Sequence, residues 1–321
     1  MTLVPGFEIE AVFGCVPART VSNMDVCAAL AGREKAEAVV KTTGFAERRV
    51  AEPGQTVEDL MLPAARAALE GVDAESVGAV VVVTFSAPDR FPAVSVRMAS
   101  KLGLPRSVAA FDVSMACSGY PYGLFAAAQF AAASGKRALL LDGDVQSAFV
   151  DHSDVNTVAV MGDAATATLI APGATSAVPA RFVFLSEGGL GGALTCGSAG
   201  PVKMDGFGVF RFVAAEVSAF LKDFLAAAGE KPDVFVPHAA NMYMVRQLAA
   251  SIGLDARLAT AGDRFANTGS SSVPLALAAS HAAGRALLAG FGAGLSASAA
   301  LVDVPVALRR GVVEARGGGD A

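Results

Sequence analysis

The stretch VAAFDVSMACSGYPYG, residues 108–123, joins an apolar run to an alanine-rich run through small residues that surround one cysteine. The pattern predicts a strand over 108–115 and a helix over 122–134, with Cys117 at the junction. Pro121 fits the first turn of that helix, where backbone N–H groups lack partners in any case. Aligned peptide dipoles and free N–H groups at a helix N-terminus favour a thiolate, so we expect a lowered pKa for Cys117.

Strand-like and helix-like runs alternate on both sides of this stretch. VGAVVVVTF and a helix over 93–101 precede it, and RALLLDGD follows it. The same order returns later in PDVFVPHAA, a helix over 242–251, RLATAGDRFAN, a helix after Ser272 and RALLAGFGAG. This alternation predicts an α/β fold in which helices cover the sheets.

An offset of 150 residues relates the two parts of the chain. It places Gly103-Leu104 on Gly253-Leu254, Ala116 on Ala266 and Gly119 on Gly269. We therefore predict two βαβ-rich halves related by a pseudo-twofold axis, residues 1–171 and residues 172–321. The same offset places Cys117 on Asn267. Ligands bind at the carboxyl ends of strands in such sheets, so we expect the equivalent loops of the two halves to face one another.

The composition is that of a globular protein with a large core. Of the 321 residues, 53% are hydrophobic and 17% are charged, and the net charge is −5. A nucleic-acid-binding protein would show a clustered basic surface, so we expect no nucleic-acid partner. The longest apolar runs, residues 77–85 and 124–133, are shorter than the ~20 residues that span a bilayer. The start shows no signal-peptide pattern, so we expect a cytoplasmic protein without a membrane partner.

The four cysteines are too scattered for a disulfide scaffold and contain no CxxC pair, so no metal site is expected. Small buried hydrophobes are expected at the three cysteines other than Cys117, namely Cys15, Cys27 and Cys196. His238 ends the buried run DVFVP, where an imidazole needs a hydrogen-bond partner or a catalytic task. His152 lies in a polar loop, where we expect solvation, and His281 in an alanine-rich helix, where we expect simple packing.

Several motifs resemble the β-ketoacyl-acyl carrier protein synthase III group of thiolase-fold condensing enzymes. They are ACSG at Cys117, VPHAAN at His238, ANTGSSSVPLAL at Asn267, GFGAGLSASAALV near the end, TTGFAERRV over 42–50 and MGDAATATL over 161–169. The match extends over nearly the whole chain, in order and in spacing. It implies a thiolase-like α/β fold whose two halves stack into a layered αβαβα body.

The resemblance also implies an acyltransferase that performs a decarboxylative Claisen condensation without a cofactor. Cys117 matches the nucleophile that accepts the acyl group, and His238 and Asn267 match the pair that binds the malonyl thioester carbonyl. The backbone N–H groups of Cys117 and Ala293 match the hole for the tetrahedral oxyanion. Loss of CO₂ from a malonyl thioester gives an enolate, which needs preorganised donors before it attacks the acyl-cysteine.

Two aromatic positions are expected at the substrate site. Phe91 matches the aromatic residue that lines the acyl pocket and that, in related dimers, reaches across from the partner subunit. From the residues alone, Phe91 is equally well a core or interface phenylalanine. Phe207 takes the place of a common asparagine near the histidine. We expect a homodimer.

The chain departs from the family where substrates are delivered. Ala38 and Val155 replace a tryptophan and an arginine that usually stack on the adenine of coenzyme A, and stacking on a base is worth about 1–3 kcal/mol. Tyr243 replaces an arginine associated with carrier docking. Arg246, one helical turn later, and Arg211 are either replacements in that role or solvated charges. We therefore expect a specialised synthase that takes a malonyl thioester and an acyl thioester of acyl carrier protein or coenzyme A.

Two other functions stay open. A non-decarboxylating acyltransferase would move the acyl group from Cys117 to an alcohol or amine, but this transfer makes no enolate and leaves Asn267 without a task. A catalytically silent partner subunit of a heteromeric synthase would not need an intact triad. Arg90, Arg97 and Arg211 are either contacts for an acidic substrate or ordinary surface charges.

Overall fold

The structure is a computed structural model that describes residues 1–173, 178–197 and 200–315. Two sheets form its frame. The six-stranded sheet has the order β15 (Arg309–Ala315), β2 (Phe7–Pro17), β8 (Ala164–Pro172), β7 (Arg137–Asp144), β5 (Val77–Val83) and β6 (Ala109–Val113). The five-stranded sheet has the order β1 (Thr2–Val4), β9 (Ala180–Ser186), β14 (Ser296–Val304), β13 (Gly284–Gly292) and β12 (Val234–Pro237).

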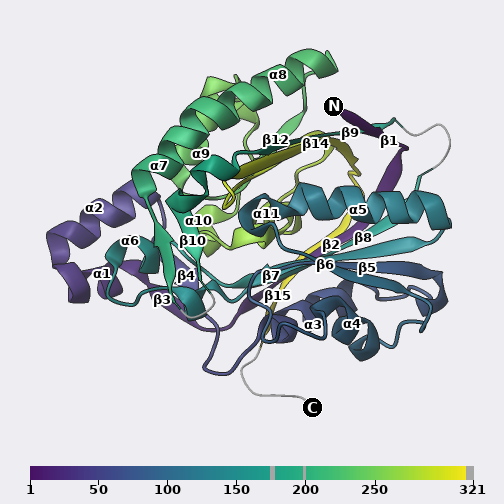
Figure 1. The fold of residues 1–321 in the computed structure, drawn as a ribbon, viewed down its shortest axis with the longest axis horizontal. Coiled ribbons are helices and arrows are strands. Elements are labelled where there is room, and N and C mark those ends of the chain that lie inside the picture. The colour runs from purple at the N-terminus through teal and green to yellow at the C-terminus, as the bar shows by residue number, and fades with distance from the viewer. Residues whose placement is uncertain (174–177, 198–199, 316–321) are drawn as a thin grey trace.

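Helices form three layers around the two sheets (Figure 1). Between the sheets lie α5 (Gly119–Ser134) and α11 (Ser272–Ala279). The outer face of the six-stranded sheet is covered by α3 (Val57–Ala68) and α4 (Val94–Lys101). The outer face of the five-stranded sheet is covered by α7 (Gly206–Phe212), α8 (Ser218–Ala228) and α9 (Met242–Ser251). The expected αβαβα layering is confirmed.

The smaller elements gather on one flank of this body (Figure 1). They are α1 (Asn23–Ala31), α2 (Arg33–Thr43), α6 (Val155–Val158), α10 (Gly262–Phe265), the strand pair β3 (Thr20–Ser22) with β4 (Glu47–Arg49), and the strand pair β10 (Leu194–Cys196) with β11 (Val202–Met204). Within the described ranges, no helix combines the length and the apolar character needed to cross a bilayer.

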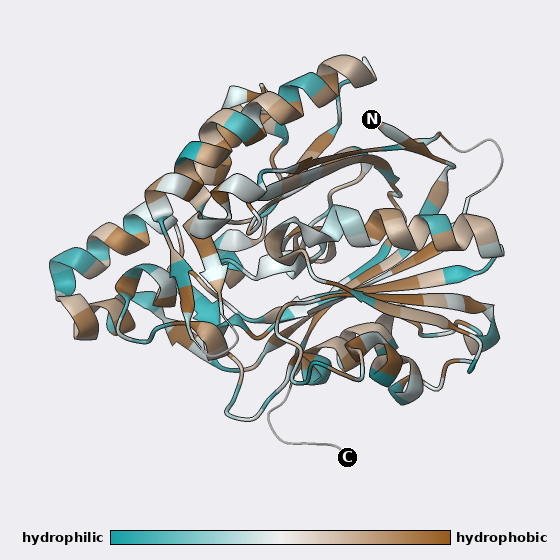
Figure 2. Cartoon of the chain, in the orientation of Figure 1, coloured by the Kyte–Doolittle hydropathy of each residue, from teal (hydrophilic) through white to brown (hydrophobic). Residues whose placement is uncertain are grey.

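Burial explains the apolar runs of the sequence. Residues 79–83 of β5 and 138–141 of β7 are buried, because helices cover both faces of the sheet. Helix α5 is buried or half-buried over residues 119–128, since both sheets enclose it. Figure 2 shows the same contrast, with hydrophobic strands at the centre and a hydrophilic stretch on α2.

The internal duplication is visible in the backbone. Ala116 has φ 43° and Ala266 has φ 59°, and in the described part of the chain they are the only residues other than glycine with positive φ. The offset of 150 residues pairs these two alanines. A 3₁₀ turn lies at or just after each of them, Ala116–Ser118 and Gly269–Ser271, and leads into α5 and α11, respectively. The two helices between the sheets therefore start from equivalent turns, and each turn brings a candidate site residue with it.

The second half lacks a full counterpart of β6. In the segment RLATAGDRFAN, only a single bridge between Phe235 and Leu258 takes the place of that strand, and α10 follows. Asn267 therefore follows a short helix and not a strand, because polar residues interrupt the apolar pattern that a strand would need.

The prediction that His281 lies in a helix is wrong. Helix α11 ends at Ala279, where the chain leaves the apolar layer, and His281 is exposed.

The two ends of the chain cross between the halves. Strand β1 pairs with β9 in the five-stranded sheet, and β15 pairs with β2 in the six-stranded sheet. We keep the division into residues 1–171 and 172–321 as a proposal, to which these two terminal strands are exceptions.

Candidate active site

Cys117 lies in the 3₁₀ turn between β6 and α5, and residues of the second half hold this turn in place. The Ser298 hydroxyl donates to the Ser118 carbonyl at 2.6 Å, and the hydroxyls of Ser118 and Ser296 lie 2.8 Å apart. Ser296 also donates to the carbonyl of Ala293 at 2.7 Å. The turn with the predicted nucleophile and the segment with the second predicted oxyanion donor thus belong to one hydrogen-bonded group.

The end of β13 approaches this turn so closely that only glycine fits. A Cβ atom on Gly290 would lie 2.9 Å from the carbonyl oxygen of Cys117. A Cβ atom on Gly292 would lie 2.8 Å from the Cβ of Cys117 and 3.4 Å from its sulfur. The glycines of GFGAG therefore allow one half of the molecule to reach the nucleophile of the other.

His238 lies at the end of β12 and is 2% exposed. Its Nδ1 atom is 2.7 Å from the hydroxyl of Ser272, the first residue of α11, and this hydroxyl also accepts the Ala239 N–H at 3.3 Å. Phe291 packs against the imidazole edge to face, with ring centroids 5.4 Å apart. Burial lowers the pKa of His238 to about 4, so the imidazole is neutral at neutral pH.

Asn267 is held by its backbone, which leaves part of its side chain free. Its N–H donates to the Val160 carbonyl at 3.1 Å, and its carbonyl accepts from Gly162 and from the Gln146 side chain. The side-chain Oδ1 accepts the Gly269 N–H at 2.9 Å, as an N-cap does. The Nδ2 atom lies 3.5 Å from its nearest hydrogen-bond acceptor, a distance at the limit for such a bond. The amide N–H groups of Asn267 are therefore available to a substrate.

Two cavities meet at Cys117. The smaller one, of about 100 Å³, is lined by Cys117, His238, Asn267 and Phe291, so the structure brings the three predicted site residues together. The larger one, of about 860 Å³, extends from Cys117 past Ala293 to residues 55–57, 85–90 and 194–197. A volume of this size lies in the range of small-molecule sites. Cys117 is the point where substrates in the two cavities would meet.

The predicted substrate and docking residues lie at the surface. Phe91 is 84% exposed and Phe207 is 75% exposed, and neither is among the residues that line the two cavities. Arg211 on α7 and Arg246 on α9 are exposed. Tyr243, which precedes Arg246 by one turn, stacks on a neighbouring phenylalanine of α7. Their roles stay predictions.

The thiol pKa is shifted in the opposite direction to the one expected. Burial raises the pKa of Cys117 to about 12, and the nearby Asp144 carboxyl adds to the shift. The expectation of a lowered value was wrong because removal of the thiolate from water outweighs the field of the helix N-terminus. Burial also raises the pKa of Asp144 itself, to about 6. At neutral pH the empty site therefore holds a thiol beside a neutral imidazole.

Several residues that shape the site were missed in the sequence. Asp144 accepts hydrogen bonds from the Phe85 and Ser86 N–H groups and from the Ser270 hydroxyl. Ser272 holds His238, and Ser296 links Ala293 to the nucleophile turn. The sequence did point to Asp144, because an acidic residue at the end of the buried run RALLLDGD needs hydrogen-bond partners. A serine carries no comparable sequence signal.

The predictions for the three other cysteines have different outcomes. Cys15 and Cys27 are buried as expected, whereas Cys196 is exposed at the end of the short strand β10, so its prediction was wrong. In the residues that the structure describes, no group of three or more His, Cys, Asp or Glu side chains is placed to hold a metal ion.

The raised thiol pKa predicts how alkylation depends on pH. The rate constant for reaction of Cys117 with iodoacetamide should rise about tenfold per unit between pH 7 and pH 9, because only the thiolate reacts and its fraction is still growing there. Intact-protein mass measurement gives the rate, and Cys117→Ala corrects for reaction at the exposed Cys196. A rate that is already level at pH 7 would contradict the prediction.

Comparison with known proteins supports the family resemblance that the motifs indicated. Residues 111–188 match the family model of 3-oxoacyl-[acyl-carrier-protein] synthase III, and residues 226–304 match the model of its C-terminal part. A β-ketoacyl-[acyl-carrier-protein] synthase III of Rhodospirillum centenum is 32% identical over 91% of this chain and 98% of its own. One from Escherichia coli strain K12 is 32% identical over 83% of this chain and 90% of its own.

Solved structures show the same relationship. A 3-oxoacyl-(acyl-carrier protein) synthase from Burkholderia xenovorans superposes with a TM-score of 0.93 and 28% identity over 98% of both chains. The priming β-ketosynthase of the R1128 polyketide biosynthetic pathway superposes with a TM-score of 0.86 and 30% identity over 95% of this chain and 98% of that one. The chain thus belongs to the β-ketoacyl-acyl carrier protein synthase III family of thiolase-fold condensing acyltransferases.

Proposed function

We propose that the chain forms a β-ketoacyl thioester from an acyl group on Cys117 and a malonyl thioester, with His238 and Asn267 as donors to the malonyl carbonyl. The observation that supports this most directly is that the three side chains line one small cavity. Plain acyl transfer from Cys117 would need no amide donor at position 267. A silent subunit would need none of the three.

In the acylation step, the Cys117 sulfur attacks the carbonyl carbon of an acyl thioester. The bond from that carbon to the donor sulfur breaks, and the thiol proton leaves with the released thiol. The oxyanion that forms on the way would accept the N–H groups of Cys117 and Ala293. Ser296 donates to the Ala293 carbonyl, in the peptide unit that follows this N–H, and so restrains the segment that carries the donor before the reaction.

In the condensation step, the malonyl carboxylate leaves as CO₂ and its bonding electron pair forms the enolate. The enolate carbon attacks the acyl carbon on Cys117, and the Cys117 sulfur leaves and takes up one proton. We assign the Ser272 hydroxyl as the donor to Nδ1 of His238, an arrangement that leaves Nε2 of the neutral ring as the N–H donor. A neutral donor stabilises the enolate without an ion pair that would hold back the departing carboxylate.

The two steps should separate in variants. Cys117→Ala should abolish formation of the acyl-enzyme, whereas Asn267→Ala should leave acylation largely intact and slow condensation by about 10²–10³-fold, the usual effect of losing one such donor. Intact-protein mass measures acylation, and product formation from a preformed acyl-enzyme and malonyl thioester measures condensation. Equal loss of acylation in a folded Asn267→Ala protein would reject this division. Transfer to alcohols or amines without malonyl thioester would favour the plain acyltransferase.

We also propose that an acyl carrier protein delivers at least one substrate, in a specialised rather than acetyl-CoA-primed role in the cytoplasm. Ala38 is an exposed alanine on α2, and Val155 packs in a small apolar cluster with Cys27, so neither position offers a stacking partner for adenine. Helix α9 borders the small cavity through Asn241 and Met244 and presents Arg246 to solvent. An acidic carrier helix would find a positive charge there.

Charge reversal tests the docking role. Arg246→Glu should raise KM for a carrier-bound substrate and weaken its dependence on salt, while turnover of a small pantetheine thioester is spared. The matched control is Arg66→Glu, an exposed arginine on α3 in the opposite outer layer. Coenzyme A substrates that equal or exceed carrier substrates in kcat/KM in both half-reactions would reject carrier delivery.

A homodimer through the open edge of the six-stranded sheet is the third part of the proposal. Strand β6 is the last strand of that sheet, its residues 109–111 are half-buried and apolar, and Phe130 of α5 lies against Phe111 at 5.4 Å between ring centroids. Phe91, on the loop before α4, is the most exposed aromatic residue in the described chain. An apolar edge strand of this kind pairs with another chain unless it is protected.

A charge introduced on the open edge of β6 should change the oligomeric state. The wild-type protein should be a dimer by light scattering at micromolar concentration, and Ala110→Lys, which places a charge on the free edge, should shift it towards monomer. Phe91→Ala should change the acyl groups that Cys117 accepts more than it changes assembly. A wild-type monomer would contradict the proposal.

A further inference from the structure

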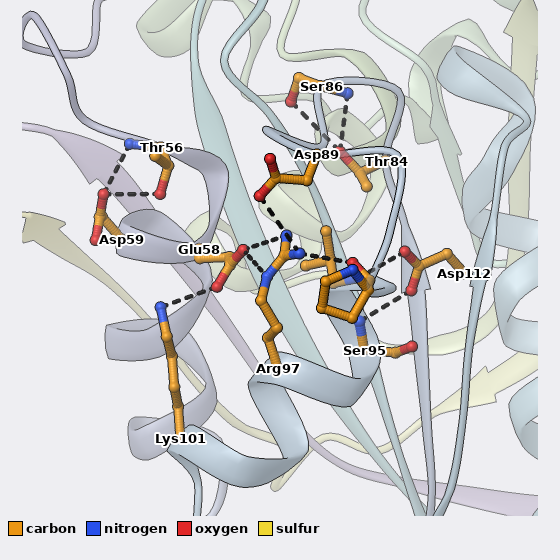
Figure 3. Close-up of polar contacts among 12 residues, drawn as sticks. Thr56, Glu58, Asp59, Thr84, Ser86, Asp89, Ser95, Arg97, Lys101 and Asp112 are labelled. Carbon is orange, nitrogen blue, oxygen red and sulfur yellow. Dashed lines mark hydrogen bonds and ion pairs between the residues drawn. The ribbon is translucent and has the colours of Figure 1, made fainter.

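An ion pair between Glu58 and Arg97 joins α3 to α4 (Figure 3). Glu58, in the first turn of α3, is 4% exposed. Arg97 of α4 donates from Nε to its Oε1 at 2.6 Å, and Nη2 of Arg97 lies 2.6 Å from the same oxygen. Lys101 lies 2.9 Å from the other carboxylate oxygen. These contacts lower the pKa of Glu58 although burial opposes the shift, so the pair is charged.

The other end of the Arg97 guanidinium holds a loop. Its Nη1 donates to the Pro92 carbonyl at 2.6 Å and lies 3.8 Å from the Asp89 carboxylate. Both acceptors belong to residues 84–93, which connect β5 to α4 and carry Phe91. A single side chain therefore joins α3, through Glu58, to this β5–α4 loop.

The ends of the β5–α4 loop are fixed separately. At its start, Asp144 accepts the N–H groups of Phe85 and Ser86 at 2.8 and 3.2 Å. At its end, Asp112 accepts the N–H groups of Val94 and Ser95 at 2.8 and 2.9 Å (Figure 3). Between these ends, in the part of the chain that the structure describes, the polar contacts that residues 87–92 make with side chains all go to Arg97. The middle of the loop thus depends on one guanidinium.

The two segments that Arg97 joins both contribute to the cavity lining. Residues 55–57, where α3 begins, residues 85–90 of the β5–α4 loop and Cys117 all line the same cavity. The start of α3 is itself fixed, because Thr56 and Asp59 form a capping box in which the Thr56 N–H donates to Asp59 at 2.7 Å (Figure 3). The contacts of Arg97 therefore connect these two lining segments directly.

We propose that Arg97, held by Glu58, is a positioning residue that sets the width of the larger cavity and thereby the acyl chains that Cys117 accepts. This rests on the proposed function, in which the cavity takes the acyl chain. A fixed apolar pocket discriminates by about 10–200-fold against one methylene too many or too few, and a loosened pocket discriminates less. The interpretation of the surface arginines also changes: Arg97 contacts two carboxylates and is not free for an acidic substrate, whereas Arg90 lines the cavity.

Two variants test the proposal, and a third serves as a matched control. The double variant Glu58→Gln with Arg97→Gln removes both charges, so no unpaired charge is left buried. Arg97→Lys keeps a charge beside Glu58 but has only one compact ammonium, which cannot replace the planar guanidinium on both segments. Lys101→Gln is the control, since Lys101 contacts Glu58 and does not contact the loop.

The measurement is the acylation rate constant of Cys117 for straight-chain thioesters of increasing length, followed by intact-protein mass. In the double variant and in Arg97→Lys, the ratio of rate constants between the best chain and the chain two carbons longer should fall by about tenfold. Lys101→Gln should keep the wild-type ratio. Condensation of a preformed acetyl-enzyme with malonyl thioester should change less than twofold, which separates positioning from general damage.

Each other result overturns the proposal in a recognisable way. An unchanged length profile in Arg97→Lys, or the same change in Lys101→Gln, would show that the guanidinium does not set the cavity. A uniform loss at every length together with slower condensation would show a purely structural role. If the double variant does not fold, Arg97→Lys decides alone. Failure of wild-type Cys117 to accept any acyl chain would reject the proposed function and this inference together.

Discussion

The contact between the end of β13 and the turn that carries Cys117 is the constraint on which the site depends. Gly290 and Gly292 leave so little space that any side chain at either position would overlap the nucleophile or its backbone. Hydrogen bonds from the start of β14 to Ser118 hold the same two pieces together. Since the turn comes from one half and the strand from the other, the halves cannot separate without loss of the nucleophile geometry.

Burial at this contact determines the chemistry of the groups around it. Exclusion of water raises the thiol pKa of Cys117, lowers the imidazole pKa of His238 and raises the carboxyl pKa of Asp144. The largest cause of all three shifts is the same, which is that a low-dielectric site disfavours charged forms. The same environment strengthens a hydrogen bond to charge that appears only during reaction, so neutral donors are well suited to an enolate.

Charged side chains outside the site act mainly on backbone segments. Asp144, Asp112 and Arg97 each bind main-chain groups at the start, the end and the middle of the β5–α4 loop, respectively. They come from β7 and β6, the two strands that flank β5, and from α4, which packs against β5 and β6. The loop that borders the acyl cavity is thus shaped by groups that do not line the reacting centre.

Periodicity and repetition in the chain were sufficient for the α/β class and the duplication, because these depend on local patterns of apolar residues, whereas the layered fold was implied by the family resemblance. The duplication even paired Ala116 with Ala266, which share an unusual backbone conformation, and motifs identified Cys117, His238 and Asn267. The pKa direction at Cys117 was decided only by tertiary packing, because desolvation depends on everything that surrounds the sulfur. The same holds for Ser272, Ser296 and Arg97: a serine or arginine acquires its role from partners distant in sequence, and no local pattern records those partners.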